Sequence, residues 1–486
     1  MTISFKNTYA DLPKNFYTNQ LPEPVTKPSP ILINEELAEF LSIPIDWINS
    51  EQGIGMLSGN ATPEGSNPIA SVYAGHQFGS WNPQLGDGRA ILLGEVKGKD
   101  GLSYDVQLKG AGPTPYSRMG DGRSPLGPVL REHLISEAMN ALGITSTRAL
   151  ASVETGEYVM RETSLPGAIL TRVARSHVRI GTFQYFASIK DIQALELLTN
   201  YVFERHYSSH PVRESKALAL LEAVMESQAE LIAKWQSVGF VHGVMNTDNM
   251  LVSGETIDFG PCAFIDNFKK DAVFSSIDHM GRYSYENQPN IVHWNIACFA
   301  QALLPIIEQN ETKALELAKE VIERFPKLYK EKEEAQMRPK FGFKKKLQGD
   351  QHLMEEFFLL LEENQLDFTL SFRRLSEMAG ETPKFSVSEF TGFPTLFDEW
   401  LNKWKARTGK EGNQEIQTEM ISNNPAIIPR NHLVEQAINE ATDGNFNLFR
   451  KLVTETANPF DLNAVNIDLA KKPRPDQTVR QTFCGT

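Results

Sequence analysis

The stretch His242–Gly260 reads HGVMNTDNMLVSGETIDFG and holds two polar loops, separated by an apolar step and a Ser-Gly turn. The first loop ends at Asn249 and the second at Asp258. Amide and carboxylate oxygens are ligands that Mg²⁺ accepts in proteins. The stretch therefore predicts a short hairpin that brings two oxygen ligands to one metal site.

Protein kinases bind Mg²⁺ with the same residue types, the Asn of a loop H-R-D-x-x-x-x-N and the Asp of a D-F-G triplet. Asn249 and Asp258 fit those two places, but the catalytic Asp would fall on Val244, whose side chain accepts no proton. Asp248 lies directly before Asn249 and would approach a bound nucleotide from another direction. The stretch keeps the metal ligands and changes the chemistry; a chance match beside an Asx-rich turn is the structural alternative.

The length of 486 residues suits about three average domains, or a bilobal enzyme with an extension. Hydrophobic residues at 41% and charged residues at 22% are ordinary globular values. The 48 basic and 61 acidic residues give a net charge of -13. This charge argues against nucleic acid and anionic membranes as partners, because both would be repelled.

The cysteines Cys262, Cys298 and Cys484 show no C-x-x-C spacing, which excludes a disulfide framework and a cysteine-built zinc site. The first thirty residues lack the pattern of a signal or transit peptide. No apolar run approaches about 18 residues. We expect a soluble protein of the reducing cytoplasm.

Residues 1–70 are rich in Pro and Asn, and only Asn34–Leu41 has a helical period, so we expect an extended segment. Residues 72–89 are rich in glycine and are predicted to be a loop that approaches a ligand. Strands are predicted at AILLGEV, from Ala90, and at YDVQLK, which ends in Lys109. A glycine-rich loop, a strand and a strand ending in Lys follow the order of a kinase small lobe, whereas the alternative is an ordinary hairpin with an exposed Lys.

A helix is predicted from Pro128, because Leu130, Leu134 and Ala138 recur every four residues. Its Glu132 is placed to pair with Lys109, as the helix Glu of a kinase does, whereas Glu137 faces elsewhere.

Three arginines, Arg172, Arg175 and Arg179, then follow within eight residues. A solvated helix face is the structural alternative for them.

Further helices are predicted at residues 191–206, 214–238, 294–308, 311–323 and 352–365, with more beyond about residue 366. His206 and His210 have the spacing of zinc ligands, but no third ligand is in register, which favours a structural helix end. The basic segment Lys340–Lys346 is predicted to be a solvated connection. The polar C-terminal stretch from Lys471 is predicted to be a mobile tail.

Several long strings resemble the SelO (YdiU) family of pseudokinases, which transfer AMP from ATP to protein hydroxyls. They are YAGHQFGSWNPQLGDGRA, QLKGAGPTPYSRMGDGRSPLGP, LREHLISEAMNALGITSTRAL, TRVARSHVRIGTFQYF, HGVMNTDNM and DFGPCAFID. The resemblance implies an α+β, protein-kinase-like bilobal fold. Its parts would be an N-terminal extended segment (1–70), a small lobe (71–190), a large lobe (191–345) and a helical C-terminal extension with a tail (346–486).

The resemblance also implies a reversed ATP, with the terminal phosphates buried and the α-phosphate facing a Ser, Thr or Tyr hydroxyl of a target protein. Mg²⁺ or Mn²⁺ would be bound by Asn249 and Asp258, and Asp248 would be the base. The implied nucleotide contacts are Gly86, Gly88, Arg89, Lys109, Asp121, Gly122, Arg172, Arg179 and Asp258, with Glu132 pairing with Lys109.

The residues support this assignment independently on one point. A triphosphate carries about four negative charges, and this acidic chain places Arg89, Lys109, Arg172 and Arg179 at predicted loop and strand positions to meet them. UMP transfer from UTP fits the same motifs. A phosphotransferase would need an Asp at Val244, and an inactive scaffold would need neither Asp248 nor the metal ligands.

The sequence departs from the family pattern at the residues linked to redox control. Cys484 is the third residue from the C-terminus, where many relatives have Cys or selenocysteine, but Phe274–Asp278 lacks the cysteine that some relatives use as its partner. We therefore expect no regulatory disulfide.

Overall fold

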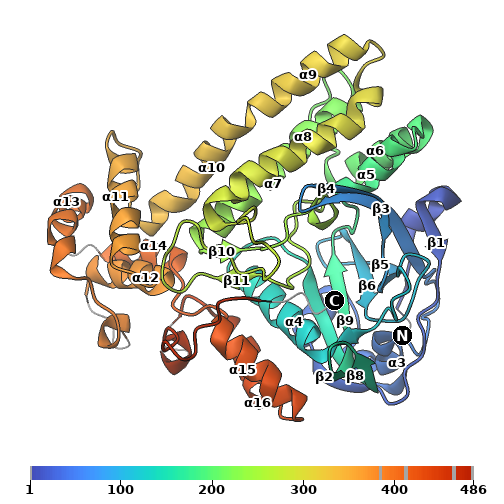
Figure 1. Cartoon of the computed structure of the whole chain (residues 1–486), viewed down its shortest axis with the longest axis horizontal. Helices are drawn as coiled ribbons and strands as arrows, with labels where there is room; N and C mark the ends of the chain where they lie inside the picture. The colour runs from blue at the N-terminus through green and yellow to red at the C-terminus, as the bar shows by residue number, and fades with distance from the viewer. Residues whose placement is uncertain (1–2, 382–385, 410–413, 462–466, 483–486) are drawn as a thin grey trace.

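An antiparallel sheet and a set of helices make up the structure, a computed structural model that describes residues 3–381, 386–409, 414–461 and 467–482 (Figure 1). The nine strands of the sheet follow the order β1-β3-β5-β6-β9-β8-β2, with β4 paired to β3 and β7 paired to β9. They are β1 (Tyr17–Asn19), β2 (Ser29–Ile33), β3 (Ile69–Gln77), β4 (Ser80–Gly86), β5 (Ala90–Lys97), β6 (Ser103–Lys109), β7 (Ser124–Pro125), β8 (Arg148–Met160) and β9 (Ser164–Ala174). The expected mixture of α and β structure is confirmed.

In Figure 1, α11 to α14 lie together at one end of the molecule, away from the sheet, whereas α7 to α10 pack on one another and α15 and α16 pack on α4. The first ten are α1 (Glu35–Phe40), α2 (Ile45–Ile48), α3 (Glu51–Ser58), α4 (Leu126–Ala141), α5 (Ile180–Ser188), α6 (Ile192–His206), α7 (Lys216–Ser237), α8 (Gln288–Ile307), α9 (Glu311–Glu323) and α10 (Phe325–Lys340). The others are α11 (Asp350–Glu363), α12 (Phe368–Met378), α13 (Asp398–Thr408), α14 (Gln414–Asn423), α15 (Asn431–Thr442) and α16 (Asn447–Thr456). A small hairpin of β10 (Phe240–Val241) and β11 (Ala263–Phe264) lies next to α7.

The centre of the sheet holds two basic side chains at fixed places. Lys109 is the last residue of β6, paired with Ala90 on β5 and with Leu170 on β9. Arg172 on β9 pairs with Gln107 on β6. Since side chains two residues apart on a strand share a face, the register of β6 and β9 brings both cations to one side of the sheet.

One prediction about this region is wrong, and one structural alternative is excluded. Residues 72–89 are not a loop: most of them form the hairpin of β3 and β4, in which Gly75 lies where another chain segment approaches. The arginine-rich segment is not a solvated helix face either, because Arg172 belongs to β9 and is 2% exposed. In both cases contacts with distant residues override the local pattern.

The strands at Ala90 and Lys109 and the helices predicted at 191–206, 214–238 and 311–323 are confirmed to within two residues. The helix predicted from Pro128 begins at Leu126. Helix α10 was not predicted, because its sequence contains Pro326 and Pro339. Proline is tolerated in the first helical turn, where its missing N–H has no intrahelical partner.

Helix α8 lies in the core beside α7 and α9. Among the described residues, the segment Tyr285–Ile307 is the one with the length and apolar content of a membrane span, and 56% of its apolar window is buried. The sequence did not suggest such a segment, because polar residues interrupt its apolar run. Buried core helices pass the same test of length and composition.

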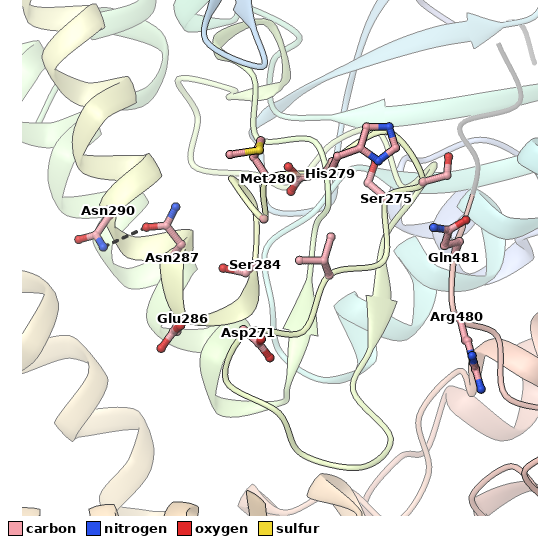
Figure 2. Close-up of a pocket in the computed structure, with 14 residues that line it drawn as sticks. Asp271, Ser275, His279, Met280, Ser284, Glu286, Asn287, Asn290, Arg480 and Gln481 are labelled. Carbon is pink, nitrogen blue, oxygen red and sulfur yellow. Dashed lines mark hydrogen bonds between the residues drawn. The ribbon is translucent and has the colours of Figure 1, made fainter.

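The polar C-terminal stretch ends in a defined contact. Thr482 is 2% exposed, its backbone N–H donates to Phe274 O at 2.7 Å, and its Oγ1 donates to Pro261 O at 2.6 Å. In Figure 2, Arg480 and Gln481 stand on one side of a polar cavity of about 830 Å³, opposite Asn287 and Asn290. A mobile tail was expected from composition, but these contacts are made largely by backbone groups, which composition does not report. Cys484 lies outside the described residues.

Lys340 differs from the solvated connection that the sequence predicted, because it ends α10 and is 2% exposed. Its Nζ donates to Asn423 O at 3.2 Å and lies 4.5 Å from the centre of the Phe372 ring. Burial lowers the pKa of the Lys340 ammonium to about 7. Between pH 7 and its ordinary pKa, the unfolded chain therefore binds the proton that the folded chain has lost.

Replacing Lys340 with methionine is expected to stabilise the protein most at pH 7 and below, where the buried ammonium is charged in the folded chain. Because the pKa is lowered in the folded state, the wild type gains stability as the pH rises. The stability advantage of Lys340→Met should shrink by about 1.4 kcal/mol for each pH unit between pH 7.5 and 9.5. Urea unfolding at several pH values measures it, with the exposed Lys345→Met as control; an advantage independent of pH would contradict the assignment.

Candidate active site

A cavity of about 680 Å³ lies between the sheet and the helices that follow it. Its lining includes all of the site residues predicted from the sequence except Glu132, which lies behind Lys109 and Arg172. These lining residues are Gly86, Gly88, Arg89, Lys109, Asp121, Gly122, Arg172, Arg179, Asp248, Asn249 and Asp258. They come from segments up to 172 residues apart in the sequence, so the fold alone brings them together.

Glu132 on α4 connects the two cations of the sheet. Its Oε2 lies 2.6 Å from Lys109 Nζ, and its Oε1 accepts from Arg172 Nε at 2.5 Å. Burial raises the pKa of Glu132, but the charges of Arg172 and Lys109 outweigh burial and the net shift is downward. The carboxylate is therefore ionised, and it fixes both cations at the cavity wall.

Helix α4 is itself held from two sides by Arg131, the residue before Glu132. Arg131 Nη1 donates to Cys262 O at 2.9 Å, four residues after Asp258. Its Nη2 donates to Asn431 Oδ1 at 2.6 Å and lies 2.5 Å from Glu435 Oε1 on α15. Helix α15, about 300 residues further along the chain, thus helps to set the position of Glu132.

Asp258 faces the same cations from the other side of the cavity. Its Oδ1 lies 2.5 Å from Arg172 Nη2 and 3.1 Å from Lys109 Nζ, and its Oδ2 lies 3.6 Å from Arg179 Nη1. Burial raises the pKa of Asp258, but these cations outweigh burial and hold the pKa well below its usual range. Its backbone is left-handed, with φ of 64°, which is rare for a residue with a Cβ and common at functional sites.

Arg179 precedes α5 and reaches the loop that contains Asp248. Its Nη1 donates to the Asp248 carbonyl at 2.5 Å, and its guanidinium lies 4.6 Å from the centre of the Tyr73 ring. Arg89 also lines the cavity and has no salt-bridge partner in the described part of the chain. Arg175, by contrast, lies over the Tyr104 ring and does not line this cavity.

His242 connects the two loops of the central stretch. Its Nε2 lies 2.8 Å from Ile257 O, and its Nδ1 accepts from Val244 N at 3.2 Å, so the ring is neutral with its proton on Nε2. The ring stacks on Trp235 at 5.3 Å. The two His242 hydrogen bonds hold Ile257, the residue before Asp258, against the loop that contains Val244. The apolar side chain of Val244 lines the cavity.

Asp248 and Asn249 lie side by side but in different surroundings. Asp248 is 6% exposed, and burial raises the pKa of its carboxyl to about 6. Asn249 Nδ2 donates to Val244 O at 3.1 Å. The amide of Asn249 is thereby oriented, and no hydrogen bond among the described residues engages its Oδ1.

The glycines of the cavity have packing reasons for their identity. A Cβ at Gly86 would lie 2.4 Å from the Tyr116 ring, and one at Gly88 would lie 2.7 Å from Tyr116 O. The N–H of Gly88 also donates to Gly86 O at 2.7 Å and is not directed at the cavity. Gly122 has φ of 65° and packs on Gly112 in the same way.

Asp121 lies at the exposed rim of the cavity and not on its floor. Its oxygens lie 2.8 and 3.1 Å from the guanidinium of Arg161. The hydrogen bond from Arg161 is the largest influence on Asp121 and lowers its pKa. Asp121 and Arg161 together form a charged pair at the entrance.

The cavity contains oxygen ligands of the kind that a divalent cation needs. No cluster of three His, Cys, Asp or Glu occurs in residues 3–381, 386–409, 414–461 and 467–482. Mg²⁺ and Mn²⁺ at nucleotide sites, however, need only one or two protein oxygens, because phosphate and water complete the shell. Asp258 and the Oδ1 of Asn249 meet that need, so the residues fit the ion.

The lining also contains residues that were not predicted as site residues, among them Asp87, Asn246 and Gln77. Asp87 is buried and accepts from Ser71 N at 3.1 Å, Asn246 accepts from Tyr283 OH at 2.7 Å, and Gln77 donates to Asp248. Asp87 lies between Gly86 and Gly88, so its place in the glycine-rich string was the available signal. Gln77 and Asn246 also lie in quoted strings, YAGHQFGSWNPQLGDGRA and HGVMNTDNM, but their contacts join segments far apart in the sequence and could not be predicted.

Comparisons with known proteins agree on one family. A family model described as protein adenylyltransferase SelO matches residues 1–457. A protein nucleotidyltransferase YdiU from Bradyrhizobium diazoefficiens is 49% identical over 485 residues, which cover 99% of both chains. Proteins of the same name from Agrobacterium fabrum and Brevibacillus brevis are 48% and 47% identical over 487 residues each, and the alignments cover at least 98% of every chain.

Proposed function

Because the chain belongs to the SelO family of protein adenylyltransferases, we propose that it transfers AMP from ATP to Ser, Thr or Tyr hydroxyls of target proteins. Pyrophosphate is the second product. The observation that carries the proposal is the cavity in which four cations, Asn249 and Asp258 surround a space that also contains Asp248 but no proton acceptor at Val244.

We place ATP between two lobes of a protein-kinase-like arrangement, a small lobe of residues 71–190 and a large lobe of residues 191–345. Residues 346–486 would form a helical extension. The strand cation Lys109 with its helix partner Glu132 supports this placement from one side of the cavity, and the Asn249 and Asp258 loops support it from the other.

The terminal phosphates are assigned to the cations of the sheet. Lys109, Arg172 and Arg179 are buried and converge on Asp258, and Arg89 adds a fourth cation. Arginine forks suit phosphate oxygens, and buried cations are screened little by solvent. The α-phosphate would then lie toward Asn249 and Asp248. Contacts of ATP with Gly86, Gly88, Asp121 and Gly122 rest on the family resemblance, since these residues also have structural roles.

A divalent cation bound by Asn249 and Asp258 would neutralise charge on the phosphate oxygens. Asp248 would accept the proton of the acceptor hydroxyl as its oxygen bonds to the α-phosphorus. The bond from the α-phosphorus to the bridging oxygen breaks, and pyrophosphate takes the electron pair. Lys109, Arg172 and Arg179 stabilise the charge that gathers on this leaving group.

Labelled ATP distinguishes the proposed reaction from phosphotransfer. ATP labelled at the α-phosphorus should label an acceptor protein or the enzyme itself, and γ-labelled ATP should not. A kinase needs a proton acceptor beside the γ-phosphate, and Val244 supplies none. The measurement is protein-bound label after gel separation, with pyrophosphate quantified in the same reaction.

Two outcomes would contradict the proposal. Protein labelled only from the γ-position, with ADP as product, would support phosphotransfer of the ordinary kinase type. ATP binding without label from either position would support an inactive scaffold. The same assay with α-labelled UTP tests whether UMP is a second transferable group.

A further inference from the structure

The hairpin of β3 and β4 touches the loop that carries Asp248 at three successive residues. His76 N donates to Thr247 Oγ1 at 2.8 Å, Gln77 Nε2 donates to Asp248 Oδ2 at 3.1 Å, and Phe78 N donates to Asn246 Oδ1 at 2.9 Å. Three successive hairpin residues thus bind three successive loop residues, Asn246, Thr247 and Asp248. In two of these contacts a backbone N–H of the hairpin donates to a side chain of the loop. In the third, the Gln77 amide donates to the Asp248 carboxylate.

The same hairpin leaves room for that carboxylate. A Cβ at Gly75 would lie 2.6 Å from Asp248 Oδ1 and 3.0 Å from its Cβ. A Cβ at Gly181 on α5 would be in ordinary contact with the Asp248 Cα, at 3.4 Å. Gly75 is therefore the residue whose missing side chain makes room for Asp248, and a side chain at Gly75 would displace the carboxylate.

The two oxygens of Asp248 have unequal surroundings. Oδ2 accepts the Gln77 hydrogen bond, whereas Oδ1 is buried and has no hydrogen-bond partner among the described residues. A buried oxygen without a donor is costly and is expected to have a functional reason. The Gln77 hydrogen bond to Oδ2 and the close approach of Gly75 to Oδ1 together fix the orientation of the carboxylate.

We propose that Gln77 is a positioning residue for AMP transfer, which fixes the orientation of the Asp248 carboxylate at the cavity through its hydrogen bond to Oδ2. This inference rests on the proposed function, in which Asp248 is the base. It assigns a role in transfer to a side chain of the sheet, contributed from 171 residues before Asp248. Gly75 contributes to the same orientation, because its lack of a side chain leaves the space that the carboxylate occupies.

Replacement of Gln77 by methionine tests the proposal, because methionine keeps the length of the side chain and removes the donor. A hydrogen bond to a charged group corresponds to a change of roughly 10- to 100-fold in rate. We expect kcat for α-label transfer to fall by that factor, while KM for ATP and the dissociation constant of ATP change less than twofold. Gln84→Met, at an exposed position of β4 in the same hairpin, should retain the wild-type rate.

A double-mutant cycle separates positioning from a general structural effect. In the Asp248→Asn background, where no carboxylate remains to be oriented, Gln77→Met should change the residual rate less than threefold. Gly75→Ala should also lower kcat in the wild-type background, because it displaces Asp248 without removing the amide of Gln77. Thermal unfolding of each variant, with a Tm close to that of the wild type, shows that the fold is retained.

Three outcomes would overturn the inference. Gln77→Met with a wild-type kcat would remove Gln77 from the transfer step, and an equal loss in both backgrounds would show that it acts independently of Asp248. A raised KM for ATP with unchanged kcat would make Gln77 a nucleotide contact. Failure of the proposed function is distinct, because the wild type would then transfer no α-label, and both conclusions would fall together.

Discussion

Asp258→Ala should lower AMP transfer at least roughly 100-fold, because it removes the one carboxylate assigned to the metal ion. The loss should appear in kcat. Asp258 is ionised throughout the accessible pH range, since its pKa is held well below the usual value, and its charge is shared among Lys109, Arg172 and Arg179. Without it, the phosphate oxygens lose a divalent counter-charge at the moment their charge redistributes.

Binding of ATP should respond in the opposite direction. Removal of Asp258 leaves three cations with less compensating negative charge, so metal-free ATP should bind at least as tightly to Asp258→Ala as to the wild type. Equilibrium binding in EDTA and transfer at saturating metal measure the two effects separately. Asp46→Ala, which removes an exposed carboxylate from α2, serves as the control. Transfer by Asp258→Ala within a few-fold of the wild type would remove Asp258 from the site.

Asp248→Asn is expected to make the protein less active and more stable. General bases contribute roughly 10²- to 10⁴-fold to rates, and the amide of asparagine cannot take the proton of the acceptor. Transfer should fall by a factor in this range, with ATP binding preserved. The measurement is the rate of α-label transfer at a fixed concentration of an acceptor protein.

The gain in stability follows from the burial of the same carboxylate. Its pKa is raised to about 6 in the folded protein, so the ionised form is favoured in the unfolded chain, and the wild type loses stability as the pH rises toward 6. Above that pH the penalty is about 3 kcal/mol, and Asp248→Asn removes it. Urea unfolding at pH 8 without metal or nucleotide should show the gain, and the gain should shrink toward pH 4. A variant less stable than the wild type at pH 8 would contradict this account.

The sequence predicted those parts of the fold whose local pattern agrees with their surroundings. β5 and β6 are apolar strands at the centre of a sheet, and α7 repeats its Leu and Ala residues on buried faces. The relation of Lys109 to Glu132 was available because each lies on an element with a strong period. At such places local propensity, hydrophobic periodicity and tertiary packing all favour the same secondary structure.

What could not be predicted depends on contacts between distant segments. β3 and β4 were interpreted as a loop because their glycines weaken the strand pattern, although Gly75 is needed for the approach of Asp248. Gln77 lies in the string YAGHQFGSWNPQLGDGRA, but its contact with Asp248, 171 residues further along the chain, could not be predicted from it. The position of Thr482 beside Pro261 rests on a bond from a backbone group and a bond from a small hydroxyl, which composition does not encode.

The contact of Arg131 with α15 has a consequence for the order in which the enzyme matures on the ribosome. Synthesis is directional, and α4 with Glu132 is complete about 290 residues before Asn431 and Glu435, its partners, have been made. A nascent chain that already contains every residue of the candidate active site therefore still lacks the support for Glu132, the partner of Lys109. The position of Glu132 is therefore fully supported only after α15 has been synthesised.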